Sequence, residues 1–108
     1  MAIPHAKSGE VIDVRPLASA LSQTRTTTLV KSKTLEIIRL VIPSGKDIPW
    51  HQAQGEITLQ CLEGRIALMV GDTAHDLEAG QMLYLAEGTP HSLRGLEGAS
   101  ALLTILLR

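Results

Sequence analysis

Two histidines carry the clearest chemical signal in this sequence, because each follows a glycine at the end of a similarly built segment. His51 comes after Gly45 and five intervening residues, and His91 comes after Gly80 and Gly88. An imidazole can exchange protons near neutral pH, bind a metal ion, or hydrogen-bond a carboxylate or carbonyl. If the strands that carry these histidines pair with each other, both rings can face one pocket.

The residues around these segments predict an all-β chain. Short apolar runs alternate with turn residues such as Glu63-Gly64, at a spacing typical of closed barrels and two-sheet folds. The expected strands span residues 26–31, 35–42, 47–52, 57–62, 65–70, 74–77, 82–85, 91–96 and 101–107. One short helical turn is expected at 17–23, and residues 1–10 are expected to form an arm.

Composition limits the classes of partner. A chain of 108 residues with 44% hydrophobic residues is expected to form one domain. Its net charge of −1 and its 2% of aromatic residues argue against nucleic acid, which needs basic patches or stacking surfaces. No apolar stretch approaches the ~20 residues that span a bilayer, and no secretory signal is visible. We therefore expect no membrane partner and a cytoplasmic location.

The last expected strand points to a subunit interface. Its runs 102–103 and 105–107 are apolar on both faces of a strand, whereas a small antiparallel sheet commonly leaves one face to solvent. A second subunit would cover that other face. We therefore expect a homodimer that associates through strand faces.

The glycine and histidine spacing resembles that of the small single-domain cupins of the RmlC-like superfamily. The matching positions are Gly45, His51 and Gly64 in the first cupin motif, and Gly80, Gly88 and His91 in the second. The resemblance covers residues 35–107. It implies an antiparallel double-stranded β-helix, or jelly-roll barrel, with little helix. The barrel would be a single domain of residues 11–108, with core motifs at 45–64 and 80–95.

This sequence replaces two of the four metal ligands that the family uses. The family holds its metal with three histidines and one glutamate, and the matching positions here are His51, Ala53, Ile57 and His91. Glu56 lies one residue early, so its side chain would point to the face opposite that of Ile57. A bulge near Gly55 would turn Glu56 inwards and give two histidines and a carboxylate. The cofactor in that case is a divalent metal such as Fe, Mn, Ni or Zn.

The candidate pocket residues are His51, His91, Ile57 and Tyr84. Tyr84 lies in the strand that precedes His91. Its hydroxyl either reaches solvent from the barrel wall or faces the pocket. The expected partner of this pocket is a small organic molecule, and no catalytic residue is assigned.

Three functions remain open at this level. The first is binding of a small organic molecule in the barrel, with no specific activity assigned. The second is metal-dependent catalysis of the dioxygenase or isomerase type, which requires an inward Glu56 beside the two histidines. The third is a structural or interaction domain whose barrel is filled by Leu59, Cys61, Leu68 and Met82.

Overall fold

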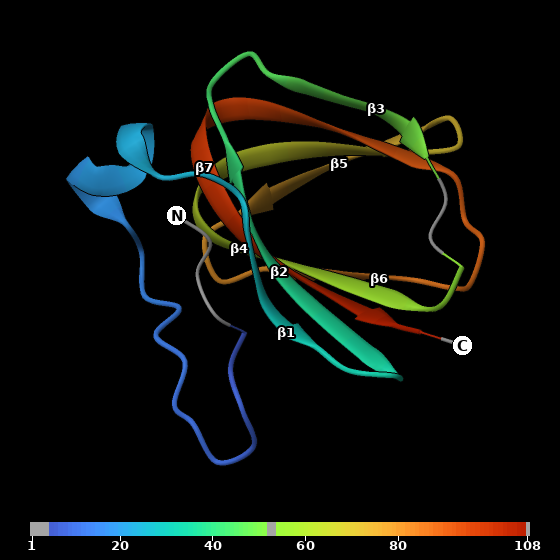
Figure 1. The fold of residues 1–108 in the computed structure, drawn as a ribbon. Helices are drawn as coiled ribbons and strands as arrows, with labels where there is room; N and C mark the ends of the chain where they lie inside the picture. Colours follow the sequence, from blue (N-terminus) through green and yellow to red (C-terminus); the bar gives the residue numbers. More distant parts are fainter. Residues whose placement is uncertain (1–4, 52–53, 108) are drawn as a thin grey trace.

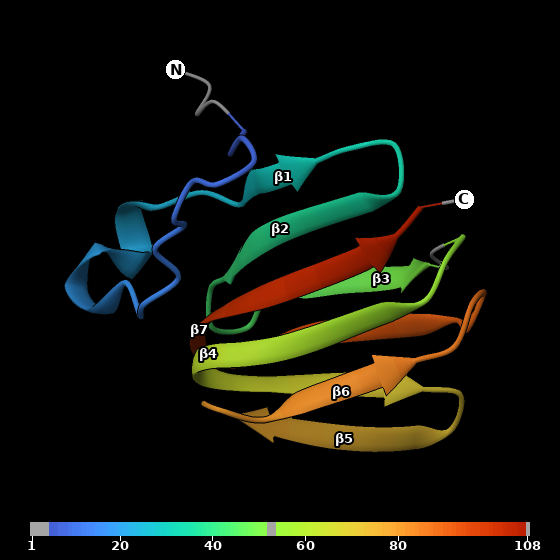
Figure 2. The ribbon, with the colours of Figure 1, turned by 90° about the horizontal axis from the view of Figure 1, so that it is seen from below.

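Two antiparallel sheets form a barrel, which confirms the all-β jelly-roll architecture expected from the sequence (Figures 1 and 2). The computed structural model describes residues 5–51 and 54–107, and the side chains of Trp50 and His51 lie outside what it describes. In chain order the elements are η1 (Ala18–Gln23), β1 (Thr27–Lys31), β2 (Leu35–Ile42), β3 (Asp47–His51), β4 (Ile57–Val70), β5 (Thr73–Glu78), β6 (Met82–Leu85) and β7 (His91–Leu106).

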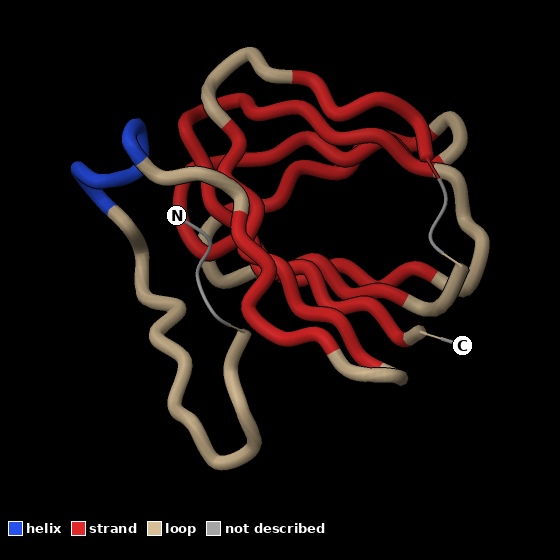
Figure 3. Tube along the Cα trace, in the orientation of Figure 1, coloured by secondary structure: helices blue, strands red, loops and turns tan. Residues whose placement is uncertain are grey.

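The long strands β4 and β7 pair with each other and belong to both sheets. The first half of β4 and the second half of β7 lie between β6 and β2, and β1 pairs with the other side of β2. The second half of β4 and the first half of β7 lie between β5 and β3. Figure 3 shows the strands of the two sheets facing each other across the barrel.

Alternating side chains place an aliphatic core between the sheets. In β2, Ile42 is fully buried in the core, and Leu40 packs against the core from the same face. Cys61 in β4 is buried among these residues and forms no disulfide. Burial raises the pKa of the Cys61 thiol, in keeping with its place as a small core residue.

A bulge around Gly64 carries β4 from one sheet into the other. Gly64 has a φ of +75°, and the register of β4 against β7 shifts between Cys61 and Ile66. Buried residues before the bulge have odd numbers, such as Leu59, whereas those after it have even numbers, such as Leu68. The bulge therefore keeps both halves of β4 facing the core. The turn predicted at Glu63-Gly64 was wrong, because the same residue pair suits a bulge within a strand.

The C-terminal strand β7 is also continuous where the sequence predicted a break between 91–96 and 101–107. Ala99 pairs with Ile42 of β2, and Ser100 pairs with Glu63 of β4. Backbone pairing on both sides thus holds this stretch extended, although its side chains lack an apolar alternation.

The segment 5–26 lies outside the barrel, beside β1 and β2 (Figure 1). The helical turn predicted at 17–23 is present as η1, a 3-10 helix in which no residue is buried. Because β1 begins only at Thr27, this segment extends well beyond the arm expected at 1–10. None of the helices in the described ranges has the length and apolar character needed to cross a membrane.

Candidate functional site

The two motif histidines lie on paired strands. β3 ends at His51 and β7 begins at His91, and their Cα atoms are partners in the ladder between these strands. The turn before β3 is made by Gly45, which has a φ of +81° and donates its N–H to the carbonyl of Gly95 at 2.8 Å. The backbone thus places the two residues opposite each other. The predicted pocket role of the His51 side chain falls outside the described part of the structure.

A tight turn delivers His91 to the start of β7. The N–H and the hydroxyl of Thr89 both donate to the carbonyl of Ala86, at 3.2 and 2.8 Å, and Gly88 has a φ of +74°. His91 is only 3% exposed, and its Nδ1 lies 3.0 Å from the Thr89 carbonyl oxygen. A carbonyl only accepts hydrogen bonds, so Nδ1 carries the hydrogen in this contact.

A cavity of about 70 Å³ lies inside the barrel next to His91. Aliphatic side chains from β2, β3, β4, β6 and β7 line it, among them Leu40, Ile48, Leu59, Leu68, Leu83 and Leu103. Within the described residues, His91 is the one polar member of the lining. The chemistry of this site is therefore that of an apolar chamber with an imidazole in its wall.

The side chains that were expected to fill the barrel do not close this cavity. Leu59 and Leu68 stand in its wall. Met82 is 61% exposed, and its Cα partner across the sheet is Gln60, a residue of the outward-facing set of β4. The prediction that Met82 helps to fill the interior was therefore wrong.

Glu56 and Tyr84 lie on the outer face of the barrel, whereas Ile57 lines the cavity. The Tyr84 hydroxyl donates to the Glu56 carboxylate at 2.5 Å, and Tyr84 is 58% exposed. This hydrogen bond raises the pKa of Tyr84 above its ordinary value, because it favours the protonated phenol. The structure thus agrees with the alternation argument for Glu56 and excludes the alternative in which a bulge turns it inwards, and it corrects the placement of Tyr84 among the pocket residues. Strand alternation separates both from Ile57.

Gly55 does not turn Glu56 inwards as the sequence allowed. A Cβ at Gly55 would lie 1.7 Å from the carbonyl oxygen of Leu106. The glycine therefore permits a close approach of the chain to β7. After it, the Leu106 N–H donates to the Glu56 carbonyl at 2.9 Å, which fixes the start of β4 against β7.

The described donors do not fit the metal site of the family that the motifs resemble. At the position of the family's glutamate, Ile57 presents a hydrocarbon side chain to the cavity, and the neighbouring carboxylate of Glu56 bonds to Tyr84 outside it. In the ranges that the structure describes, no three His, Cys, Asp or Glu side chains gather in a way that could hold a metal. Ala53 lies outside those ranges.

A polar cluster on the outer face was not predicted from the sequence. The Glu63 carboxylate accepts hydrogen bonds from the Ser100 hydroxyl and from the N–H groups of Leu17 and Ala18. Nearby, Arg39 is only 8% exposed. Arg39 could have been noticed in the sequence as the one polar residue of the stretch 37–42 in β2. Glu63 was missed because it was assigned to a turn.

Comparison with known proteins matches most of the barrel to a protein family. A family model described as the cupin domain matches residues 38–106. The search of the curated proteins found no match.

Solved structures share the fold over nearly the whole chain. A conserved protein of unknown function from Streptococcus pyogenes, SPY1581, superposes with a TM-score of 0.77 at 22% identity, over 100% of this chain and 96% of that one. A cupin superfamily protein from Desulfitobacterium hafniense DCB-2, DSY2733, gives a TM-score of 0.78 at 18% identity, over 95% and 100% of the two chains. These likenesses show the fold.

One similar structure is an enzyme of greater length. A mutant salicylate 1,2-dioxygenase from Pseudoaminobacter salicylatoxidans gives a TM-score of 0.69 at 18% identity, and the match covers 74% of this chain but 25% of that protein. The barrel is thus shared between proteins of very different size, and the shared fold does not choose a reaction.

Proposed function

The chain belongs to the cupin family, and we propose that its barrel binds a small, largely apolar organic molecule beside His91. The observation that carries this proposal is the cavity, in which an imidazole interrupts a wall of aliphatic side chains. Apolar pockets with a few placed polar groups are typical ligand sites, because the apolar wall provides affinity and the polar group provides orientation.

The size of the cavity limits the ligand. About 70 Å³ is well below the roughly 300–1,000 Å³ of pockets that hold drug-sized molecules. An occupant of a few non-hydrogen atoms fits without rearrangement of the barrel. The wall offers no described charged group, so a charged ligand would lose its hydration without an ionic partner. We therefore expect an uncharged molecule with at most one polar end, directed at His91.

The donor set favours binding over metal-dependent catalysis. A metal site built on two histidines needs a further ligand such as a carboxylate, and Glu56 faces away from the cavity in this barrel. Ile57 instead adds apolar surface at that position. This replacement supports an apolar guest, since a hydrocarbon side chain contributes to binding only through contact and exclusion of water.

A matched pair of variants in β6 tests the proposal. Leu83 lines the cavity, whereas the adjacent Met82 faces solvent, so Leu83→Phe fills the chamber and Met82→Phe leaves it open. Titration with short alcohols, ketones and monocyclic aromatics, followed by amide NMR shifts, should perturb the cavity residues of the wild type and of Met82→Phe. Leu83→Phe should weaken these responses about tenfold or more.

Two results would count against the proposal. The first is a wild-type barrel whose cavity residues respond to none of these molecules. The second is a response of Leu83→Phe equal to that of Met82→Phe, because binding would then lie elsewhere. Urea unfolding of both variants verifies that they are folded, and elemental analysis of untagged wild type and His91→Ala separates organic binding from binding of a metal.

A further inference from the structure

One carboxylate makes the most concentrated contact between the N-terminal segment and the barrel, beside single hydrogen bonds from Ala6 to Leu29, from Arg39 to Arg15 and from Val41 to Thr26. The N–H groups of Leu17 and Ala18 donate to the two oxygens of Glu63, at 2.7 and 2.9 Å. The Ser100 hydroxyl of β7 donates to the same carboxylate. Glu63 therefore joins the bulge of β4, the neighbouring β7 and the start of η1 at a single point.

The backbone is strained at this contact. Ala18 has a φ of +52° and is the one non-glycine residue with positive φ among those that the structure describes. A side chain with a Cβ is unfavourable in this left-handed region, so surrounding contacts must hold it there. The N–H of Ala18 is itself one of the two that Glu63 binds. At Ala18 the backbone strain therefore opposes docking of the segment on the barrel, whereas the hydrogen bond to Glu63 favours it.

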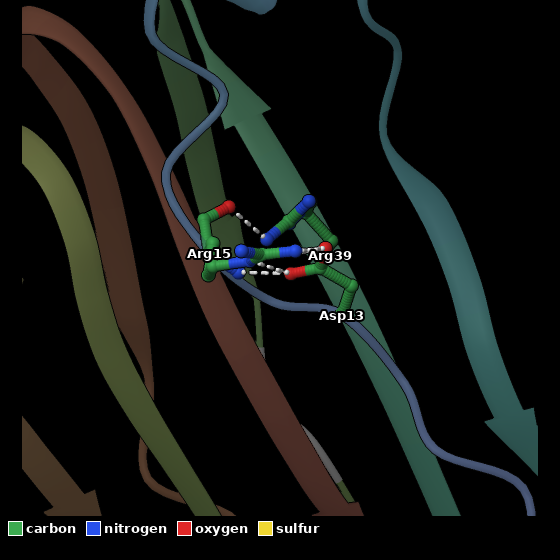
Figure 4. A network of polar contacts seen from close by, with 3 residues as sticks. All are labelled: Asp13, Arg15 and Arg39. Atoms are coloured by element: carbon green, nitrogen blue, oxygen red, sulfur yellow. Dashed lines mark hydrogen bonds and ion pairs between the residues drawn. The ribbon is translucent and has the colours of Figure 1, made fainter.

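The buried cation Arg39 contributes both for and against the docking of this segment. Arg39 of β2 is 8% exposed, and one of its terminal nitrogens donates to the carbonyl of Arg15 at 2.8 Å. Figure 4 shows this contact, with the Arg15 guanidinium turned to Asp13. The Nε of Arg39 has no hydrogen-bond partner within the described residues, and burial of a polar group without a partner is unfavourable. Water could reach Arg39 if the segment moved away.

No apolar side chain of the segment is fully buried, although Ile12, Val14, Leu17 and Leu21 are partly buried. No residue of η1 is buried, and the segment carries Val11 at 98% exposure. One apolar contact is visible where Leu21 of η1 approaches β7, because a Cβ at Gly98 would lie 3.1 Å from the Leu21 Cδ2 atom. An element with few buried apolar contacts can open locally while the core remains folded.

We propose that residues 5–26 form a strap that opens as a unit from a folded barrel, and that Glu63 is its latch. Opening releases the strained backbone of Ala18 and uncovers Arg39 on the outer face of β2. Hydrogen bonds to an ionised group are stronger than neutral ones, so the carboxylate decides the balance between the closed and open arrangements.

The charge on Glu63 makes the latch sensitive to acid. Burial raises the pKa of Glu63, but hydrogen bonds from Ser100, Leu17 and Ala18 and the nearby charge of Arg39 outweigh it, so the pKa lies below its ordinary value. The stabilisation is therefore present above the ordinary glutamate pKa and is lost as the pH falls through the lowered one. Arg39 from β2 and Cys61 from β4 interact electrostatically with this carboxylate. The Asp13–Arg15 pair of the strap lies near Arg39.

Hydrogen exchange measured residue by residue tests the strap. The Glu63→Gln substitution should speed exchange of the Leu17, Ala18 and Thr24 amides about tenfold or more. Exchange of the barrel amides of Cys61 and Leu106, which donate to the carbonyls of Gln81 and Glu56, should stay unchanged.

Additional variants separate a latch from a general structural role. The Ala18→Gly substitution relieves the positive φ and should slow exchange in the strap, and Ser100→Ala should speed it without removing charge. Glu97→Gln changes an exposed carboxylate of the same strand and should have no effect on the strap. Unchanged strap exchange in Glu63→Gln, or equal acceleration of strap and barrel amides, would overturn the proposal.

Discussion

Neighbouring side chains of β4 face opposite sides of the sheet, and this alternation determines what the cavity contains. Ile57 contributes hydrocarbon to the interior, while Glu56 meets the Tyr84 hydroxyl outside. A shift of one residue would exchange the two faces. The difference between an apolar chamber and a carboxylate-bearing site therefore depends on the position of one glutamate.

The titration of Tyr84 reports the direction of Glu56. Because the phenol donates to the carboxylate, its pKa is raised, and Glu56→Gln should bring that pKa down towards the ordinary tyrosine value. Tyr84 is the single tyrosine of the chain, so absorbance of the tyrosinate form measures it directly. Glu36→Gln, which removes a carboxylate on β2, is the control. An unchanged Tyr84 titration in Glu56→Gln would place the carboxylate elsewhere.

The turns and strands that position the site could be predicted from the sequence, whereas the contacts of its polar side chains could not. The spacing of Gly45 and Gly88 placed turns where the structure has them, and alternation correctly warned that Glu56 opposes Ile57. It could not decide whether Gly55 bulged, because a glycine also serves a close approach, here to the Leu106 carbonyl. A choice between those uses depends on a strand that lies about fifty residues away in the sequence.

At the level of elements, the bulge at Gly64 allows β4 to serve two sheets. Gly64 has a φ of +75°, and a Cβ at this position would lie 2.1 Å from the carbonyl oxygen of Gly98. Gly71 has a φ of +58° with open space around its Cβ position. Both glycines therefore have a left-handed backbone, but only the Cβ position of Gly64 is crowded by neighbouring atoms.

The two glycines provide a matched test of the bulge. Gly71→Ala should lower the free energy of unfolding by about 1–2 kcal/mol, the penalty of a left-handed alanine. Gly64→Ala should lower it by about 2–5 kcal/mol, because overlap with the facing strand adds to that penalty. Urea unfolding measures both. Equal losses would mean that β4 and β7 do not approach closely at this position.

Strand positions were predictable from sequence, whereas strand continuity was not. The expected strand at 35–42 matches β2, since its apolar alternation is local information. The breaks expected within β4 and β7 are absent, because backbone pairing with neighbours holds these stretches extended despite glycines and polar residues. The strap latch was hidden for the same reason, since Glu63 lies in the bulge.

For the whole molecule, we propose that the outer face formed by β6, the first half of β4 and the second half of β7 is the homodimer interface expected from the sequence. Met82, Tyr84 and Leu106 are 61%, 58% and 45% exposed. The strand register gives Met82 and Tyr84 the outward face of β6. Exposed apolar patches of this kind mark association surfaces, and tyrosine and methionine are enriched in them.

Charges placed on this face should dissociate the dimer. The double variant Met82→Lys, Leu106→Lys should change the molar mass in solution, measured by light scattering, from that of two chains to that of one. Val11→Lys alters a residue that is 98% exposed on the N-terminal segment and should leave the dimer intact. A wild type that remains monomeric at high concentration would refute this interface.

If the barrel encloses an accessible apolar chamber beside His91, a crystal held under xenon should reveal it. Dry apolar cavities admit such apolar guests. We expect xenon density among Leu59, Leu68 and His91 in the wild type, and its loss in Leu83→Phe. Xenon found only on the surface of the wild type, with none inside the barrel, would contradict this expectation.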